Sequence, residues 1–348
     1  MIDNTSVCPV CGAKQKDNSM SCFSCGFEEA HCVLFSGEKA YNAWKNLVDE
    51  QKKKNIESML VNSRNIGSKL FISKRGICFF DANKSRAIIV DYSTRKMQVI
   101  DDVKKISHSG LHSVWIKNDG HLDSSGDNES NQRRLSGIDN AIDIATSPCC
   151  TYVLTSSGRI ISRGSTTLGC QVDNWTDVKS ICCAEEHIFG IKNDNSVVFA
   201  ASEKSELSKY ASVINQWKDV KKIATNDFYA VALCHNGSVL YAGDCEYKST
   251  CKSWSDIIDI VANKEYVVGL AKDGKVLLAG DVNFAGFLSR IIDKGRIEAS
   301  KWENMIFIAS DDFFIAGISK CGELKVAGNI NSNFKDVHGE FMKAILGN

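Results

Sequence analysis

Four cysteines near the start of the chain stand in two closely spaced pairs, Cys8-Pro9-Val10-Cys11-Gly12 and Cys22-Phe23-Ser24-Cys25-Gly26. Two residues between paired cysteines let both thiolates reach one metal ion, and a second pair completes a tetrahedral shell. The glycine after each pair tolerates positive φ, so that a backbone N–H can approach the sulfur. Four thiolates leave no open position for water, which favours Zn²⁺. We therefore expect one structural zinc ion, with Cys8, Cys11, Cys22 and Cys25 as its ligands.

Two other uses of this cysteine pattern are chemically open. Four thiolates also bind iron in a rubredoxin-like site, and a Cys-x-x-Cys pair can act as a thioredoxin-like redox centre. His31 and Cys32 follow closely as candidate competing ligands, although we interpret them as part of a linker. Residues 6–28 resemble the short zinc ribbons found at the N-termini of many bacterial and archaeal proteins. A segment of this size is expected to fold only with its metal.

A helix is predicted to follow this segment, with Ser36 as a candidate N-cap. Its apolar residues recur at helical spacing: Ala40, Ala43, Trp44, Leu47, Val48, Ile56, Met59 and Leu60. The run Lys52-Lys53-Lys54 is interpreted as a solvated helix face rather than a nucleic-acid contact, because acidic residues balance basic ones in this part of the chain. The sequence thus predicts a zinc ribbon over 1–30 and a helical linker over 31–65.

Composition limits the class of protein. Of 348 residues, 42 are basic and 42 acidic, so no bulk field attracts nucleic acid or an anionic membrane. The first residues lack a secretory signal, and no apolar run approaches the roughly 18 residues of a membrane span. An odd count of 15 cysteines argues against a disulfide framework. We therefore expect a cytoplasmic protein that does not cross a membrane.

The rest of the chain is a repeat with rigid internal offsets. Each unit has an anchor, an Asp or Asn two residues later, an isoleucine six residues after the anchor, and then a turn residue. The Asp or Asn, for example Asp219, is interpreted as a turn cap through side-chain to backbone hydrogen bonds. The six anchors are Ile100, Ile138, Trp175, Trp217, Trp254 and Trp302. Such self-similarity predicts a repeat architecture.

Each unit is predicted to consist of strands. Apolar runs are separated by hairpin dipeptides such as Asp119-Gly120, Asn236-Gly237 and Asp273-Gly274. A seventh unit is expected to be split between the ends, with Leu70 to Phe80, and Gly76 at the turn, as its second half, and Phe334-Lys335-Asp336-Val337 as its first half. Joining both termini in one sheet removes exposed edges. We expect an all-β, seven-bladed β-propeller over 66–348, closed by both termini and preceded by the ribbon and helical linker.

The repeat resembles that of the regulator of chromosome condensation family, over about four fifths of the chain. Repeats of that family carry a W-x-D-I-x-x-I-x-A start, a D-G hairpin and a G-x-N-x-x-x-Q element, which here is Gly126 to Gln132 and, more weakly, Gly164 to Gln171. Several units lack that element, which makes this a divergent example. The resemblance implies a propeller that binds protein partners, since the family includes a nucleotide-exchange factor for a small GTPase and a protein inhibitor of β-lactamase.

No residue set predicts catalysis. The recurring Trp, Ile and Gly positions are what packing requires of every blade, and the sequence has neither a phosphate-binding glycine loop nor a G-x-S-x-G nucleophile motif. The pairs Cys149-Cys150 and Cys182-Cys183 are interpreted as buried thiols. We therefore expect a protein that is not an enzyme.

Two units are longer than the others and place apolar residues at helical spacing in their insertions. In the shorter insertion these residues are Leu207, Tyr210, Ala211 and Ile214, and in the longer one they are Phe284, Phe287, Leu288, Ile291 and Ile292. Such segments either cover the rim of the propeller or present a face to a partner. The second set is our candidate partner-binding site.

The function predicted from sequence is that of a protein-interaction scaffold or adaptor. The propeller face and inserted loops would dock a protein partner of unknown identity, with the ribbon as a structural or second binding module. One alternative is a nucleic-acid-associated regulator that binds through the ribbon. A second alternative, implied by the resemblance alone, is an exchange-factor-like regulator of a GTPase.

Overall fold

A computed structural model of the chain describes two compact units, Met1–Asn62 with Lys320–Gly322, and Ser63–Ser319 with Glu323–Asn348. Residues 281–296 are the longest internal stretch outside the described residues. The described residues are 7–13, 21–22, 25, 27, 38–65, 67–73, 75–92, 94–109, 111–165, 172, 174–280, 297–312, 314–328 and 333–347.

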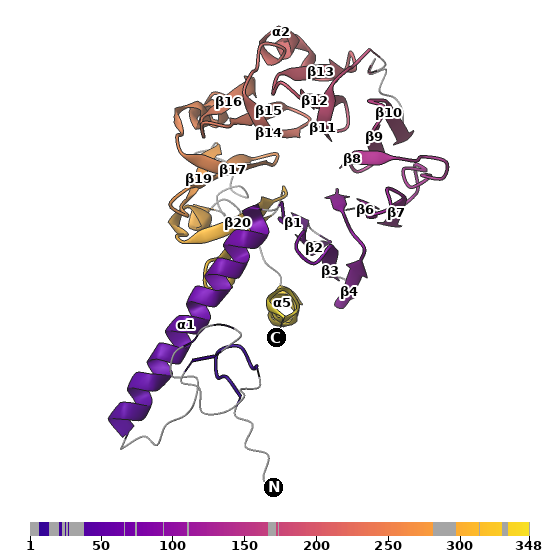
Figure 1. Ribbon diagram of the computed structural model, residues 1–348. Coiled ribbons are helices and arrows are strands. Elements are labelled where there is room, and N and C mark those ends of the chain that lie inside the picture. Colours follow the sequence, from indigo (N-terminus) through magenta and orange to yellow (C-terminus); the bar gives the residue numbers. More distant parts are fainter. Residues whose placement is uncertain are drawn as a thin grey trace. The chain divides into compact units, whose positions relative to one another are not determined.

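Within the described residues, the larger unit holds seven antiparallel sheets, each built from strands that follow one another in the chain (Figure 1). Blade 1 has four strands: β1 (Lys69–Ser73), β2 (Gly76–Asp81), β3 (Arg86–Asp91) and β4 (Lys96–Asp101). Blade 2 comprises β5 (Lys105–His108), β6 (His112–Ile116) and β7 (Leu122–Gly126). Blade 3 comprises β8 (Ala141–Thr146), β9 (Cys150–Thr155) and β10 (Ile160–Gly164). Blade 4 comprises β11 (Val178–Cys183), β12 (His187–Lys192) and β13 (Val197–Ala201).

The remaining blades repeat this pattern. Blade 5 comprises β14 (Val220–Asn226), β15 (Tyr229–Cys234) and β16 (Val239–Gly243). Blade 6 comprises β17 (Ile257–Ala262), β18 (Tyr266–Ala271) and β19 (Val276–Gly280). Blade 7 comprises β20 (Met305–Ser310), β21 (Phe314–Ser319) and β22 (Leu324–Gly328). From blade 2 to blade 7 the first strands contact one another in order. Blade 1 contacts blade 2 through β2 and β5 and contacts blade 7 through β1 and β20, so the ring is closed (Figure 1). The predicted seven-bladed propeller is confirmed.

The predicted hairpins form as their sequences require. Gly120, Gly237 and Gly274 have φ of 87°, 83° and 85°, a conformation that glycine adopts without strain. Each donates its N–H to the carbonyl three residues earlier, for example Gly237 to Cys234 at 3.0 Å. The same turns also join neighbouring blades by backbone hydrogen bonds. In blade 6, the Ile257 N–H donates to the carbonyl of Gly237, in the turn of blade 5, at 3.0 Å. The turns therefore close a hairpin and fix the next blade.

Short helices cover the outer strands of blades 4 to 7. They are η1 (Ser208–Tyr210), α2 (Ala211–Ile214), α3 (Glu246–Ser249), η2 (Thr250–Ser253) and η3 (Glu298–Lys301). Segment α2 contacts β13, and Leu207 and Ile214 are fully buried in the core that includes Trp217. The shorter insertion therefore serves to cover its blade, one of the two uses that its periodicity left open.

The split blade predicted from sequence is wrong. Residues Asn333–Leu346 form helix α5 instead of a strand, and blade 1 takes all of its strands from a single stretch of chain. The physical reason is that Phe341 and Ile345 lie one turn apart on a buried face of α5, where Val337 and Met342 are buried as well. The place next to β20 is already filled by β1, so no further strand fits between blades 7 and 1.

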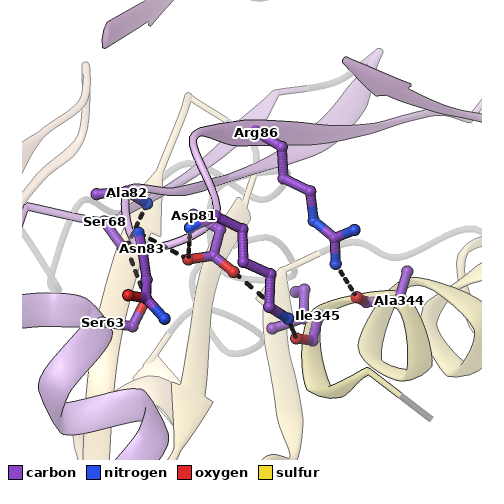
Figure 2. A network of polar contacts seen from close by, with 9 residues as sticks. Ser63, Ser68, Asp81, Ala82, Asn83, Arg86, Ala344 and Ile345 are labelled. Carbon is purple, nitrogen blue, oxygen red and sulfur yellow. Dashed lines mark hydrogen bonds and ion pairs between the residues drawn. The ribbon is translucent and has the colours of Figure 1, made fainter. Parts of the chain in front are cut away.

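Helix α5 packs on blade 1 and is held there by basic side chains (Figure 2). The Arg86 guanidinium donates to the Ala344 carbonyl at 3.1 Å, and Lys84 Nζ donates to the Ile345 carbonyl at 3.4 Å. Both carbonyls belong to the last turn of the helix, where cations are favoured. The C-terminal segment thus contributes a helix to blade 1 rather than a strand.

The smaller unit contains the cysteine segment and most of helix α1 (Glu38–Asn65), which confirms the predicted helix. Its core is formed by Cys8, Cys22, Phe27 and Val48, with Trp44 partly buried against them. Among the described residues, none of the helices combines the length and apolarity needed to span a membrane.

Candidate functional site: a four-cysteine cluster and a set of acidic loops

The four cysteines of the N-terminal segment lie together. Their sulfur atoms are all within 4.8 Å of one another. The Cys8 and Cys25 sulfurs are 3.8 Å apart, and the Cys11 and Cys22 sulfurs are 3.6 Å apart. A tetrahedral ion with metal–sulfur bonds of about 2.3 Å separates its ligand sulfurs by roughly 3.8 Å. The cluster therefore has the dimensions of a four-thiolate metal site.

Two similar turns position these thiols. Gly12 N–H donates to the Cys8 carbonyl at 2.9 Å, and Cys8 N–H donates to the Ala13 carbonyl at the same distance. Gly12 has a φ of 73°, which explains the glycine after the first pair. In the second turn, Cys22 N–H donates to the Phe27 carbonyl at 2.9 Å. These hydrogen bonds therefore shape the two turns that bring the cysteine pairs together.

Burial raises the pKa of two thiols of the cluster, Cys8 and Cys25. Cys8 and Cys22 are almost fully buried. Burial, together with the neighbouring thiols, raises the pKa of Cys25 to about 12. A thiol with so high a pKa is protonated at neutral pH, and a bound cation would be needed to hold it as a thiolate. The donor set suits a soft, tetrahedral ion.

The partner-binding residues predicted in the longer insertion fall outside the described residues. They are Phe284, Phe287, Leu288, Ile291 and Ile292. His31 and Cys32, the candidate competing ligands, also lie outside them.

The propeller carries a second feature that sequence reasoning missed. In blades 4 to 7, the connections between first and second strands, which we call the acidic loops, are residues 184–186, 226–228, 263–265 and 311–312, where Asn226 is also the last residue of β14. They contain one basic residue, Lys264, and one large exposed apolar residue, Phe228, which is 49% exposed. They contain six carboxylates: Glu185, Glu186, Asp227, Glu265, Asp311 and Asp312. Each loop supplies only one or two acids, so the charge emerges only in the folded ring.

Hydrogen bonds between neighbouring blades hold the acidic loops together. Glu185 N–H donates to Asp227 Oδ1 at 3.0 Å, and Lys264 N–H donates to Asp312 Oδ1 at 2.8 Å. The Asn226 side chain bridges to the next loop by donating to the Asn263 carbonyl at 2.7 Å. The four loops therefore form one connected surface. Burial, with repulsion from Asp227 and Glu186, raises the pKa of Glu185.

The buried histidines of the propeller are engaged in its structure. His187 contacts Ser205 Oγ at 3.2 Å and Thr225 Oγ1 at 2.7 Å, which joins blades 4 and 5. His112 makes a corresponding contact with Thr151 Oγ1 at 2.9 Å. Burial lowers the pKa of His187 to about 3 and that of His112 to about 4, so both rings are neutral at physiological pH.

Comparison with known proteins defines the fold. No family model and no curated protein sequence matches the chain. Among solved structures, it is similar to the CRINKLY WD40 ectodomain of the Arabidopsis thaliana receptor kinase ACR4, at 13% identity and a TM-score of 0.53, covering 75% of this chain and 94% of that chain. It is equally similar to Prp20p from Saccharomyces cerevisiae, at 10% identity and a TM-score of 0.53, covering 79% and 85% of the two chains. This likeness establishes the fold: a β-propeller.

Proposed function

We propose that this protein is a protein-interaction scaffold whose acidic loops dock a partner with a basic surface. The observation that carries this proposal is the connected surface of six carboxylates, which also presents Phe228, 49% exposed and with the Lys264 ammonium 5.9 Å from the centre of its ring. Electrostatic complementarity raises the rate of encounter and selects the partner, while an aromatic side chain can anchor the contact.

The framework under this surface is rigid. Tyr229, the residue after Phe228, is buried, and its hydroxyl lies within hydrogen-bond distance of the Asn263 carbonyl, at 2.6 Å, and of the Tyr266 carbonyl, at 2.8 Å. Loops held in this way are already ordered before binding, and an ordered surface loses less entropy when a partner docks. The yeast propeller Prp20p is described with binding properties toward Gsp1p and histones, so a propeller of this fold can present protein-binding surfaces.

The test compares two charge reversals in the full-length chain. One variant carries Glu185→Lys with Glu265→Lys, two exposed acids of the acidic loops whose carboxylates make no hydrogen bond or ion pair among the described residues. The matched control carries Asp139→Lys with Glu303→Lys, two exposed acids at the opposite ends of blades 3 and 7. Proteins captured by the wild-type chain at low salt should be lost with the first variant and kept with the control.

Equal recovery by both variants would refute docking on the acidic loops. A loss with Phe228→Asp should match the loss with the charge reversal, because both act on one surface. The insertion with Phe287 and Ile291 remains a second proposed contact. It is tested by Phe287→Asp with Ile291→Asp in the same capture experiment.

We also propose that the four-cysteine cluster holds one structural Zn²⁺. Its sulfur spacing and its set of four thiol ligands support this assignment. Metal analysis of the purified chain should find one zinc per chain, and Cys8→Ser should lower that content. Cys245→Ser, which replaces a cysteine of the propeller, is the control and should leave it unchanged. Iron in place of zinc, or equal zinc in both variants, would contradict the proposal.

A further inference from the structure

The propeller encloses a cavity of about 650 Å³ along its axis. Residues of the first strands β1, β5, β8, β11, β14 and β17 line it, together with Arg64. Four isoleucines of the repeat contribute an apolar wall: Ile106, Ile144, Ile181 and Ile223. A cavity of this volume, with an apolar wall and a few polar groups, is typical of small-molecule sites.

The charged residues of this cavity are unbalanced. Five basic side chains line it, against two carboxylates. Lys105 Nζ pairs with Asp143 Oδ1 at 2.8 Å, and Lys222 Nζ pairs with Asp259 Oδ1 at 2.6 Å. Asp143 is used further, because its Oδ2 accepts the Ile181 N–H at 2.8 Å. Both carboxylates are therefore already committed to neighbouring cations.

Arg64 donates to the Ile258 carbonyl at 3.0 Å, so two basic residues of the cavity are left: Lys221, and Lys69 at the start of β1. In the described part of the chain, the Lys69 ammonium has no hydrogen-bond or ion-pair partner, and its side chain is exposed to the cavity. Burial within the ring and repulsion from Lys222 and Lys105 lower the pKa of Lys69, while Asp143 and Asp259 act in the opposite direction. A cation held close to other cations is stabilised when an anion binds among them.

We propose that this cavity binds a small phosphate-bearing molecule, with its phosphate at Lys69, Lys105 and Lys222 and its organic part against the isoleucine wall. Lysines from three blades line this one cavity, and the excess of positive charge there suits a dianion better than a single carboxylate charge. Lysine binds phosphate as a point charge and needs no fixed planar geometry. This site is independent of the acidic loops, so either proposal can fail without the other.

Calorimetric titration of the full-length chain with inorganic pyrophosphate at low ionic strength tests the site. Lys69→Gln should weaken binding by about tenfold, the size of a lost hydrogen bond to a charged group. Lys69→Arg keeps the charge and should retain binding within a few-fold. The matched control is Lys104→Gln, which changes an exposed lysine next to β5 that does not line the cavity.

A second measurement needs no variant. Pyrophosphate should protect Lys69, but not Lys104, from acetylation of the wild-type chain, as read by mass spectrometry. The proposal is overturned if the wild-type chain does not bind pyrophosphate, if Lys69→Gln and Lys104→Gln behave alike, or if Lys69 is not protected. Succinate binding as tightly as pyrophosphate would overturn the phosphate assignment.

Discussion

At the scale of single residues, the Asp or Asn two positions after each anchor is explained by backbone conformation. Its φ lies between 55° and 62° in all six units. Asp and Asn tolerate this left-handed region far better than other residues with a side chain. The side-chain cap predicted from sequence has a counterpart at Asp102, which accepts the Asn118 N–H at 3.3 Å. At Asp219 no such bond is found within the described residues.

The conformation can be tested at Asp256, where φ is 55°. Asp256→Val should destabilise the propeller by about 1–2 kcal/mol, because a β-branched residue is disfavoured in the left-handed region. Asp256→Gly should have a much smaller effect, since glycine adopts this conformation freely. Urea unfolding of the two variants measures the difference. Equal destabilisation by Val and Gly would show that the carboxylate matters instead of the backbone.

The neutral state of His187 has a consequence for the pH dependence of stability. Its pKa of about 3 lies below the value near 6.5 of an unfolded chain. As the pH falls below 6.5, the unfolded chain binds a proton that the folded chain does not, so stability is lost. Between pH 6.5 and 4.5, His187→Gln should reduce the slope of the unfolding free energy against pH by about 1.4 kcal/mol per pH unit.

The comparison is made by denaturant unfolding at several pH values. His121→Gln, at an exposed turn, is the control and should keep the wild-type slope. A wild-type slope in His187→Gln would mean that this ring is protonated in the folded protein.

At the scale of elements, the anchor of a blade packs against one residue of the second strand, and the sizes of these two residues are complementary. The Trp254 anchor lies over Gly269, where an added Cβ would approach the Trp254 ring to 2.6 Å. Where the anchor is Ile138, the corresponding residue is Val153, in the same cluster. Where the anchor is Ile100, that residue is Trp115. Large and small residues thus exchange places while the volume is kept.

A double exchange tests this match. Gly269→Val alone should destabilise by about 1–3 kcal/mol, because it overpacks the space under the Trp254 ring. Trp254→Ile alone should leave a cavity and also destabilise. Combining the two copies the Ile138 and Val153 pair, so the double variant should be more stable than the sum of the single effects. A thermal or urea unfolding cycle measures the coupling. Strict additivity would contradict the match.

The repeat made most of this fold predictable from sequence, since six blades share their offsets, and the cysteine spacing predicted which thiols lie together. Blade 1 shows where such reasoning fails. The sequence predicts Gly76 at the turn, but in the structure Ser85 holds the turn position. Its φ is 49°, and its carbonyl accepts the Val103 N–H at 2.7 Å. Gly76 instead lies in β2, where a Cβ would meet the Val90 carbonyl oxygen at 2.2 Å. A close approach between strands leaves no local sequence signal.

At the scale of the whole molecule, a net charge of zero conceals charges that are separated in space. Six carboxylates gather in the acidic loops of blades 4 to 7, and basic residues exceed acids in the axial cavity. The members of each group come from different repeats, so their proximity depends on the ring. A net charge of zero excludes a strong overall electrostatic field around the protein, but it is compatible with two local sites of opposite charge.

The division into two units predicts separate responses to loss of metal. The core of the smaller unit is built on Cys8, Cys22, Phe27 and Val48, so its packing depends on the cysteine cluster. The blades pack through clusters that contain none of the four cysteines. Because a metal that binds only the folded state contributes its binding free energy to folding, a strong chelator should unfold the cysteine segment and leave the propeller folded.

Two signals separate these outcomes. Chelation should expose the partly buried Trp44 and shift its fluorescence to longer wavelength, with Trp44→Phe as the control that identifies the signal. The far-ultraviolet signal of the strands and the main thermal transition should stay the same, and added Zn²⁺ should restore the fluorescence. Loss of the main transition on chelation would show that the propeller depends on the metal, and an unchanged Trp44 signal would show that the cysteine segment does not.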